Sequence, residues 1–202
     1  GANLLWETDW EDLLIRSNVP RTNHNLSITG GSEKSSYFFS VDYLNEEGPV
    51  ITSDFERITT RLNTESQVND WLKVGINTSF SRSKSGNPDQ NSGSTTQAIT
   101  WIYSVSSIFP VYARDAQGNL VFDNAGNVFV DAGNNNGRPP GQAFNATRNI
   151  NGGENILASL LLGDETRIRT NFIGNGFAEI KLFDEIKFTT RFSYENYLFD
   201  SH

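Results

Sequence analysis

Few residues of this chain have the types and spacing that enzymatic chemistry requires. The sequence contains two histidines, His24 and His202, far apart along the chain, and no cysteine, which excludes thiol nucleophiles and disulfides. It contains no Ser/His/Asp set, phosphate-binding loop or His-Glu-x-x-His motif. The adjacent carboxylates Glu46–Glu47 and Asp184–Glu185 fall in expected turns, where solvation explains them better than acid–base catalysis. We therefore expect no catalytic residue, no metal site and no cofactor, and a protein that is not an enzyme.

A second group of carboxylates belongs to a short internal repeat. Residues 115–122 and 123–130 each consist of an Asp-x-x-Gly-Asn turn followed by an apolar triplet. This pattern predicts a small β-hairpin. Calcium binding by Asp115 and Asp123 is the weaker interpretation, because the spacing lacks the closing glutamate and the ligand rhythm of an EF-hand loop.

The charge of the chain limits its partners. The formal net charge is −8 at pH 7. Binding to nucleic acid needs a basic face, so we expect no nucleic-acid partner. An acidic chain fits a surface that is exposed outside a cell.

Alternation of apolar and polar residues is the main structural signal. It predicts six strands, at residues 23–30, 35–44, 55–67, 71–83, about 165–180 and 186–198. Successive side chains of a strand point to opposite faces. In 71–83, for example, Leu72, Val74, Ile76 and Phe80 oppose Lys73, Asn77 and Ser79. The prediction is an all-β fold, an antiparallel meander of sequentially paired strands.

The polar faces of these strands carry several large basic or amide side chains. The candidates for a water-filled lumen are Arg57, Arg61, Asn77, Arg167, Arg169 and Arg191. An ordinary solvated sheet surface is the alternative interpretation of the same residues.

Two segments lie outside the strands. Within residues 3–17, Trp6, Trp10, Leu13 and Leu14 share one helical face, with Thr8 or Asp9 as the cap, so we expect a short N-terminal helix. Residues 84–163 show no sustained alternation and form a long loop. Its aromatic side chains, Trp101, Tyr103, Phe109 and Tyr112, are candidates to contact a substrate or a covering partner. Packing within the loop is the alternative for these four.

The lengths of the connections favour a membrane barrel. They alternate between short turns near residues 31, 69 and 184 and longer loops near residue 48 and over 84–163, as in outer-membrane barrels with short periplasmic turns and long extracellular loops. Most strands reach about 10 residues, longer than in most globular sheets. Aromatic residues stand near strand ends, where an interfacial girdle would lie: Tyr37, Tyr43, Trp71, Tyr194 and Tyr197. We therefore divide the chain into an extracellular loop with a helix (1–22), four strands (23–83), a long extracellular loop (84–163) and two strands (164–202).

Four ordered motifs carry a resemblance to a known family. They are Gly30–Gly31, the run YLNEEG at 43–48, the run DFERITTRLN at 54–63 and the run DWLKVGIN at 70–77. The glycine pair is expected to begin a tight turn over residues 30–33, since glycine accepts a positive φ without strain. Together they resemble the early barrel segment, without the plug, of SusC/RagA-type TonB-dependent outer-membrane transporters.

The resemblance implies a function and partners. It implies part of a transmembrane β-barrel in the bacterial outer membrane, surrounded by lipid. It implies import of an oligosaccharide or a peptide under a SusD-like surface lipoprotein, with energy from TonB. The plug and the TonB-contacting box are not in this sequence. Because a barrel of this class takes about 22 strands, we expect the native protein to be much longer.

A different class of protein would share the alternation. A secreted β-sandwich adhesin or glycan-binding module would bury the apolar faces of two sheets against each other and would fold alone. The two hypotheses differ in whether the six strands form one sheet or two.

Overall fold

The computed structural model describes residues 7–86, 97–133, 140–142, 148, 151–163, 165–183 and 185–201. The chain divides into two units. The sheet unit comprises residues 20–47, 54–86 and 166–202, and the loop unit comprises residues 1–19, 48–53 and 87–165.

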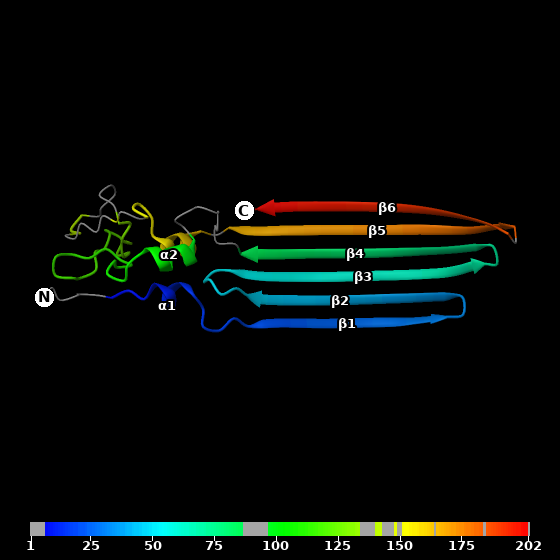
Figure 1. Ribbon diagram of the computed structural model, residues 1–202, viewed down its shortest axis with the longest axis horizontal. Coiled ribbons are helices and arrows are strands. Elements are labelled where there is room, and N and C mark those ends of the chain that lie inside the picture. The colour runs from blue at the N-terminus through cyan, green and yellow to red at the C-terminus, as the bar shows by residue number, and fades with distance from the viewer. Residues whose placement is uncertain are drawn as a thin grey trace. The chain divides into compact units, whose positions relative to one another are not determined.

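The sheet unit is one six-stranded antiparallel sheet. Its strands are β1 (Arg21–Ser32), β2 (Ser35–Glu47), β3 (Asp54–Asn69), β4 (Leu72–Gly86), β5 (Thr166–Phe183) and β6 (Ile186–Ser201). They lie side by side in chain order, β1 to β6 (Figure 1). The predicted all-β meander is therefore confirmed. A single sheet also differs from the two facing sheets that a β-sandwich requires.

The strands are longer than the alternation predicted. β2 continues to Glu47 and pairs there with Asp54 of β3, and β4 continues to Gly86, which pairs with the same Asp54. Backbone hydrogen bonds extend a strand whether or not its side chains alternate. The ends of these strands are mostly polar and do not alternate, so the sequence pattern did not predict the pairing that continues through them.

The first tight turn does not lie at the Gly30–Gly31 pair. Both glycines belong to β1, and the turn follows at Glu33 and Lys34. Neither glycine has a positive φ. Their role is steric, because a Cβ at Gly30 would overlap the Tyr37 ring and one at Gly31 would overlap the Ser35 carbonyl oxygen. The prediction that these glycines supply a left-handed turn is therefore wrong.

The described part of the loop unit contains three short helices. They are α1 (Trp10–Leu14), α2 (Ala98–Ser104) and α3 (Ile156–Leu162). Asp9 caps α1 by accepting from the Asp12 amide at 3.0 Å, and Asn155 caps α3 by accepting from Ala158 at 3.1 Å. The sequence predicted a short helix within residues 3–17 with Thr8 or Asp9 as its cap, and α1 with Asp9 as its cap confirms this; Trp6 lies outside the described residues. The sequence did not predict α2 or α3.

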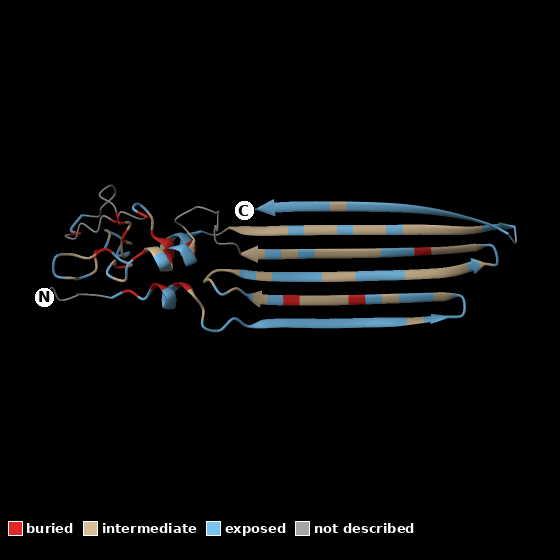
Figure 2. Cartoon of the chain, viewed as in Figure 1, coloured by how far each residue is buried: buried red, intermediate tan, exposed pale blue. Residues whose placement is uncertain are grey.

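The hydrophobic core of the chain lies in the loop unit. Its buried members are Trp10, Leu14, Ala98, Trp101, Val105, Ile156, Leu157 and Leu160. In the sheet unit, by contrast, most side chains are half-buried or exposed, with buried positions confined to a few places such as Ser40 and Leu44 (Figure 2). The sheet thus presents two broad faces, whereas the loop unit packs around its own centre.

No helix in the described part of the chain is long and apolar enough to cross a membrane.

Candidate functional site

The register of the sheet assigns every strand residue to one of two faces. Residues that pair across strands share a face, because their side chains project from the same side of the pleat. Arg61 pairs with Ser40 of β2 and with Ser79 of β4, so these three lie on one face. Following the register across all six strands places all six lumen candidates on this same face: Arg57, Arg61, Asn77, Arg167, Arg169 and Arg191. We call it the polar face. The register shows that the candidates share a side; whether that side faces a lumen stays a prediction.

The polar face holds a shallow groove near the end of the sheet where β3 begins. The groove is lined by Asn23, Asn25, Ser40, Asp42, Arg57, Thr59, Arg61, Ser79 and Ser81. All of these side chains can donate or accept hydrogen bonds. The groove is mainly polar and could therefore hold water or a polar ligand.

Basic side chains of the polar face make two kinds of contact. Lys73 pairs with Glu65 at 3.0 Å and Lys187 pairs with Glu179 at 2.8 Å, near the ends of the strands opposite the groove. Arg57 instead lies 6.0 Å from the centroid of the Phe55 ring, and Arg169 lies 5.8 Å from that of Phe199. A guanidinium over an aromatic face keeps its hydrogen-bond donors available at its edge. These two arginines are therefore placed to contact polar groups above the face.

Amide side chains cross the middle of the polar face in one row. Asn77 of β4 pairs with Asn63 of β3 and with Asn175 of β5. Asn175 in turn pairs with Ser193 of β6. This row is therefore uncharged but rich in hydrogen-bonding groups.

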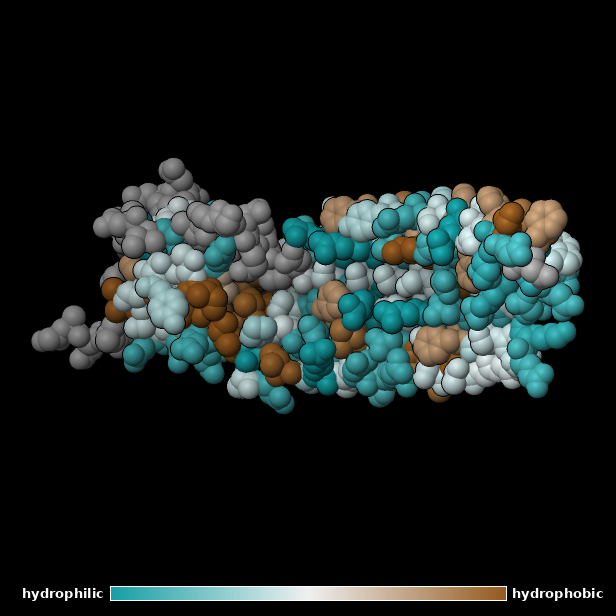
Figure 3. All heavy atoms as spheres, turned by 45° about the vertical axis from the view of Figure 1, so that its right-hand side comes forward, coloured by the Kyte–Doolittle hydropathy of each residue, from teal (hydrophilic) through white to brown (hydrophobic). Residues whose placement is uncertain are grey.

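The opposite face, which we call the apolar face, exposes large hydrophobic side chains. Its members include Leu26, Ile28, Phe39, Ile58, Leu62, Ile76, Phe172, Phe188, Phe192 and Leu198, each with more than a third of its surface exposed. Figure 3 shows hydrophobic and hydrophilic side chains next to each other over the sheet. An exposed apolar surface this extensive marks an interface with lipid or protein, since soluble monomers rarely show one.

The four aromatic candidates of the loop do not form one surface. Trp101 has no exposed area and packs edge-to-face on Trp10, with ring centroids 5.4 Å apart. Phe109 is half-buried against the same core, and Tyr112 is 38% exposed. Tyr103, by contrast, is 87% exposed. Of the four, only Tyr103 and Tyr112 therefore have substantial surface for an outside partner, and such a contact stays a prediction.

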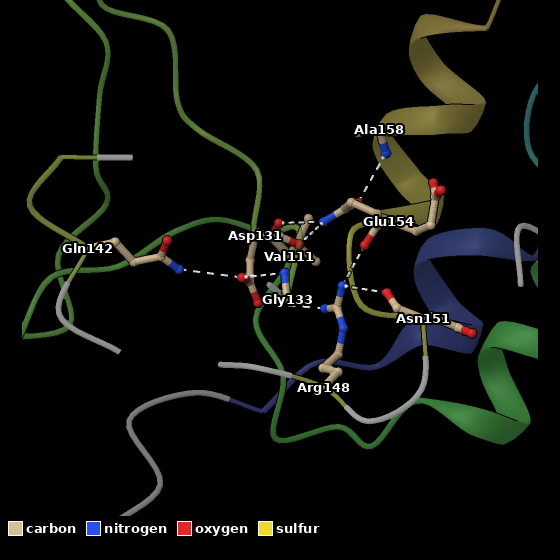
Figure 4. A network of polar contacts seen from close by, with 9 residues as sticks. Val111, Asp131, Gly133, Gln142, Arg148, Asn151, Glu154 and Ala158 are labelled. Carbon is tan, nitrogen blue, oxygen red and sulfur yellow. Dashed lines mark hydrogen bonds and ion pairs between the residues drawn. The ribbon is translucent and has the colours of Figure 1, made fainter. Parts of the chain in front are cut away.

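A buried polar network, which the sequence did not indicate, organises the loop unit (Figure 4). The side chains of Arg148 and Asp131 are 1% and 2% exposed, and their Nη1 and Oδ2 atoms lie 3.6 Å apart. Arg148 Nη2 donates to the Glu154 carbonyl oxygen, and Asn155 Nδ2 donates to the carbonyl oxygens of Val111 and Asp131. Burial lowers the pKa of the Arg148 guanidinium, and the charge of Asp131 opposes that shift. The network thus ties segments near residues 111, 131, 148 and 155 together.

The two Asp-x-x-Gly-Asn repeats form matching turns. Asp115 Oδ1 accepts from the backbone amides of Gln117 and Asn119 at 2.9 and 2.8 Å, and Asp123 repeats the pattern with Ala125 and Asn127 at 2.8 Å each. Hydrogen bonds from the asparagine side chains, followed by those from the backbone, lower the pKa of both carboxyl groups. Antiparallel bridges flank the turns, from Arg114 to Leu120 and from Phe122 to Val128. Each carboxylate is thus engaged within its own turn.

Among the described residues, no three His, Asp or Glu side chains gather as a metal centre would require.

The comparisons with known proteins agree with this arrangement. No family model matches the chain. Over 186 residues, 86% of the chain, the sequence is 30% identical to the TonB-dependent receptor SusC of Bacteroides thetaiotaomicron. Over 73 residues, 36% of the chain, it is 42% identical to the TonB-dependent receptor P26 of Formosa agariphila. The fold is similar to that of the RagAB peptide importer in its closed-closed state, with a TM-score of 0.64 over 94% of this chain at 22% identity.

The chain is much shorter than the proteins it matches. It spans 17% of SusC, 7% of P26 and 19% of the matched RagAB chain. The single meander, with one polar and one apolar face, is that of a partial transmembrane β-barrel. The resemblance to SusC/RagA-type TonB-dependent transporters is confirmed, and the chain matches one segment of those proteins.

Proposed function

We propose that this chain forms part of the wall of an outer-membrane importer. The observation that carries the proposal is the separation of the sheet into two unlike faces. All six lumen candidates lie on one face, and exposed Ile, Leu and Phe side chains cover the other. In a transmembrane barrel the apolar face meets lipid and the polar face lines the lumen.

The connections support one orientation of the wall. Every segment of the loop unit joins the sheet at the same ends of the strands, since β1 begins, β2 ends, β3 begins, β4 ends and β5 begins there. The connections at the other ends are short. Because outer-membrane barrels place long loops outside, the loop unit is extracellular and the turn at Glu33–Lys34 is periplasmic. This retains the division of the chain into loop and strand segments.

The relatives support a proposal for the cargo and partners of the whole importer. One relative is named for the RagAB peptide importer, and another is SusC. We propose an oligosaccharide or a peptide as the cargo, a SusD-like lipoprotein as the cover and TonB as the energy donor through regions outside this chain. Tyr103 and Tyr112 are the loop residues proposed to contact cargo or cover. The secreted β-sandwich loses support, because all six strands belong to one sheet.

Cysteine labelling in intact cells tests the orientation. This segment has no cysteine, so a single one can be introduced at Ala125, an exposed turn residue of the loop unit, or at Lys34, an exposed turn residue of the sheet unit. In the full-length protein a membrane-impermeant maleimide should label Ala125→Cys in intact cells, and Lys34→Cys only after the outer membrane is permeabilised. Equal labelling of both variants in intact cells would contradict the proposal.

A further inference from the structure

On the apolar face, the side chains of β4 change from mostly hydrophobic to basic near the end of the strand. Along β4 its side chains run Leu72, Val74, Ile76, Thr78 and Phe80, and then Arg82 and Lys84. Among the described strand residues, these two are the only lysine or arginine side chains on the apolar face. A cation on a lipid-facing surface is costly unless it reaches the membrane boundary.

The spacing along β4 places Arg82 at that boundary. From Leu72 to Arg82 the strand rises about 34 Å at about 3.4 Å per residue. A tilt of about 40° reduces this rise to about 26 Å across the membrane, close to the apolar band of about 25 Å of outer-membrane barrels. Trp71 lies just before Leu72 at the other limit of the band, and 53% of its surface is exposed, as in an aromatic girdle. Arg82 therefore lies where lipid headgroups begin.

The neighbours of Arg82 leave its charge available. It pairs with Ile58 of β3 and Thr170 of β5, and Tyr43 of β2 lies one strand further in the same row. None of these three side chains is acidic. Arg82 and Lys84 are exposed, and within the described residues neither has an ion-pair partner.

The acidic residues of this face lie at or beyond the level of Lys84. Glu56 and Asp200 share the row of Lys84, and Asp54 and Glu47 lie one row further out. Glu56, Ile58, Arg82 and Lys84 together line a small groove. An anion seated at this groove would contact both cations, with Arg82 on its acyl-chain side and the carboxylates on its outer side.

We propose that Arg82 and Lys84 bind the phosphate group of an anionic lipid in the outer leaflet. Guanidinium and ammonium groups are the usual phosphate-binding side chains, and basic residues at a membrane surface attract anionic headgroups. Two apolar neighbours of Arg82 would contact the first carbons of the acyl chains: Ile58, its partner on β3, and Phe80, two residues before it in β4. This inference rests on the proposed function, because it uses the assignment of the apolar face to lipid.

The test uses the full-length protein in nanodiscs of phosphatidylcholine with or without lipid A, which carries phosphate groups. The readout is the temperature at which the folded, heat-modifiable gel band is lost. Lipid A should raise this temperature for the native protein, and the Arg82→Gln/Lys84→Gln variant should lose most of the rise. The corresponding loss of lipid affinity is about fivefold for each charge removed, or about 1 kcal/mol. Inorganic phosphate added to phosphatidylcholine nanodiscs should give no rise, which separates lipid from free phosphate.

The matched control removes two cations from the polar face of the same sheet. Arg57→Gln/Arg61→Gln should keep the full rise with lipid A. An equal rise in the native protein and in the Arg82→Gln/Lys84→Gln variant would overturn the lipid site while leaving the face assignment intact. A loss of the rise in Arg57→Gln/Arg61→Gln, with none in Arg82→Gln/Lys84→Gln, would show that the polar face meets lipid, and the proposed function would then fail as well.

Discussion

The guanidinium of Arg148 stacks on the indole of Trp101, with its central carbon 5.0 Å from the ring centroid. The same guanidinium lies 5.7 Å from the Phe109 ring and is paired with Asp131. One side chain therefore links the hydrophobic core of the loop unit to its polar network.

Removing this side chain should loosen the loop unit selectively. Arg148→Met keeps much of the volume but leaves Asp131 buried without its charge partner, which costs about 3–5 kcal/mol in comparable sites. Limited proteolysis of the full-length protein should then cut within residues 97–163, while the heat-modifiable band of the barrel persists. The control is Tyr103→Ala, which removes an exposed ring. Unchanged protease resistance in Arg148→Met would show that the network does not hold the loop together.

The pair Gly75 and Phe177 gives a packing prediction within the sheet. These residues face each other across β4 and β5, and a Cβ at Gly75 would overlap the Phe177 ring. Gly75→Ala should therefore destabilise the barrel by about 1–3 kcal/mol through overpacking. The measurement is the temperature at which the folded gel band is lost. Gly176→Ala is the control, since the nearest atom to its Cβ would be 3.9 Å away, and an equal loss in both variants would contradict the steric account.

The two aspartate turns predict an acid-sensitive hairpin. Hydrogen bonds lower the pKa of Asp115 and Asp123 in the folded state. A lowered folded pKa means that the stabilisation is present above the unfolded value of about 3.9 and is lost as the pH falls through the folded pKa. Hydrogen exchange of residues 113–130, corrected for the intrinsic effect of pH, should show protection that is constant from pH 5 to 7 and decreases below about pH 4. Asp115→Asn/Asp123→Asn should abolish that decrease.

The sheet could be predicted well from the sequence, for a physical reason. A strand with one polar and one apolar face alternates polar and apolar residues along the sequence. Ile76 and Asn77 could therefore be assigned to opposite faces from the sequence alone. The strand ends were underestimated because pairing continues through polar residues such as Glu47. The turn at Gly30–Gly31 was misplaced because the sequence does not distinguish a glycine that avoids a steric overlap from a glycine that adopts a positive φ.

The loop unit could be predicted much less well. α2 and α3 each have 7 residues, too few turns for a helical period to stand out. The buried pair joins Asp131 and Arg148 through contacts that no local pattern encodes. The burial of Trp101 likewise depends on Trp10, which is distant in sequence. Long-range packing decides the last two features.

The central claim is that one face of the sheet meets lipid and the other a lumen. Ile76 and Asn77 are adjacent, lie near the middle of the apolar band and point to opposite faces. An arginine on the lipid face at the bilayer midplane costs about 2–4 kcal/mol, whereas a lumen arginine remains in water.

The most direct measurement is therefore the heat-modifiable gel mobility of two full-length variants, Ile76→Arg and Asn77→Arg, in outer-membrane preparations. We predict that Ile76→Arg destabilises the folded barrel or prevents its insertion, whereas Asn77→Arg assembles like the native protein. Normal assembly of Ile76→Arg together with failure of Asn77→Arg would invert the two faces and contradict the account.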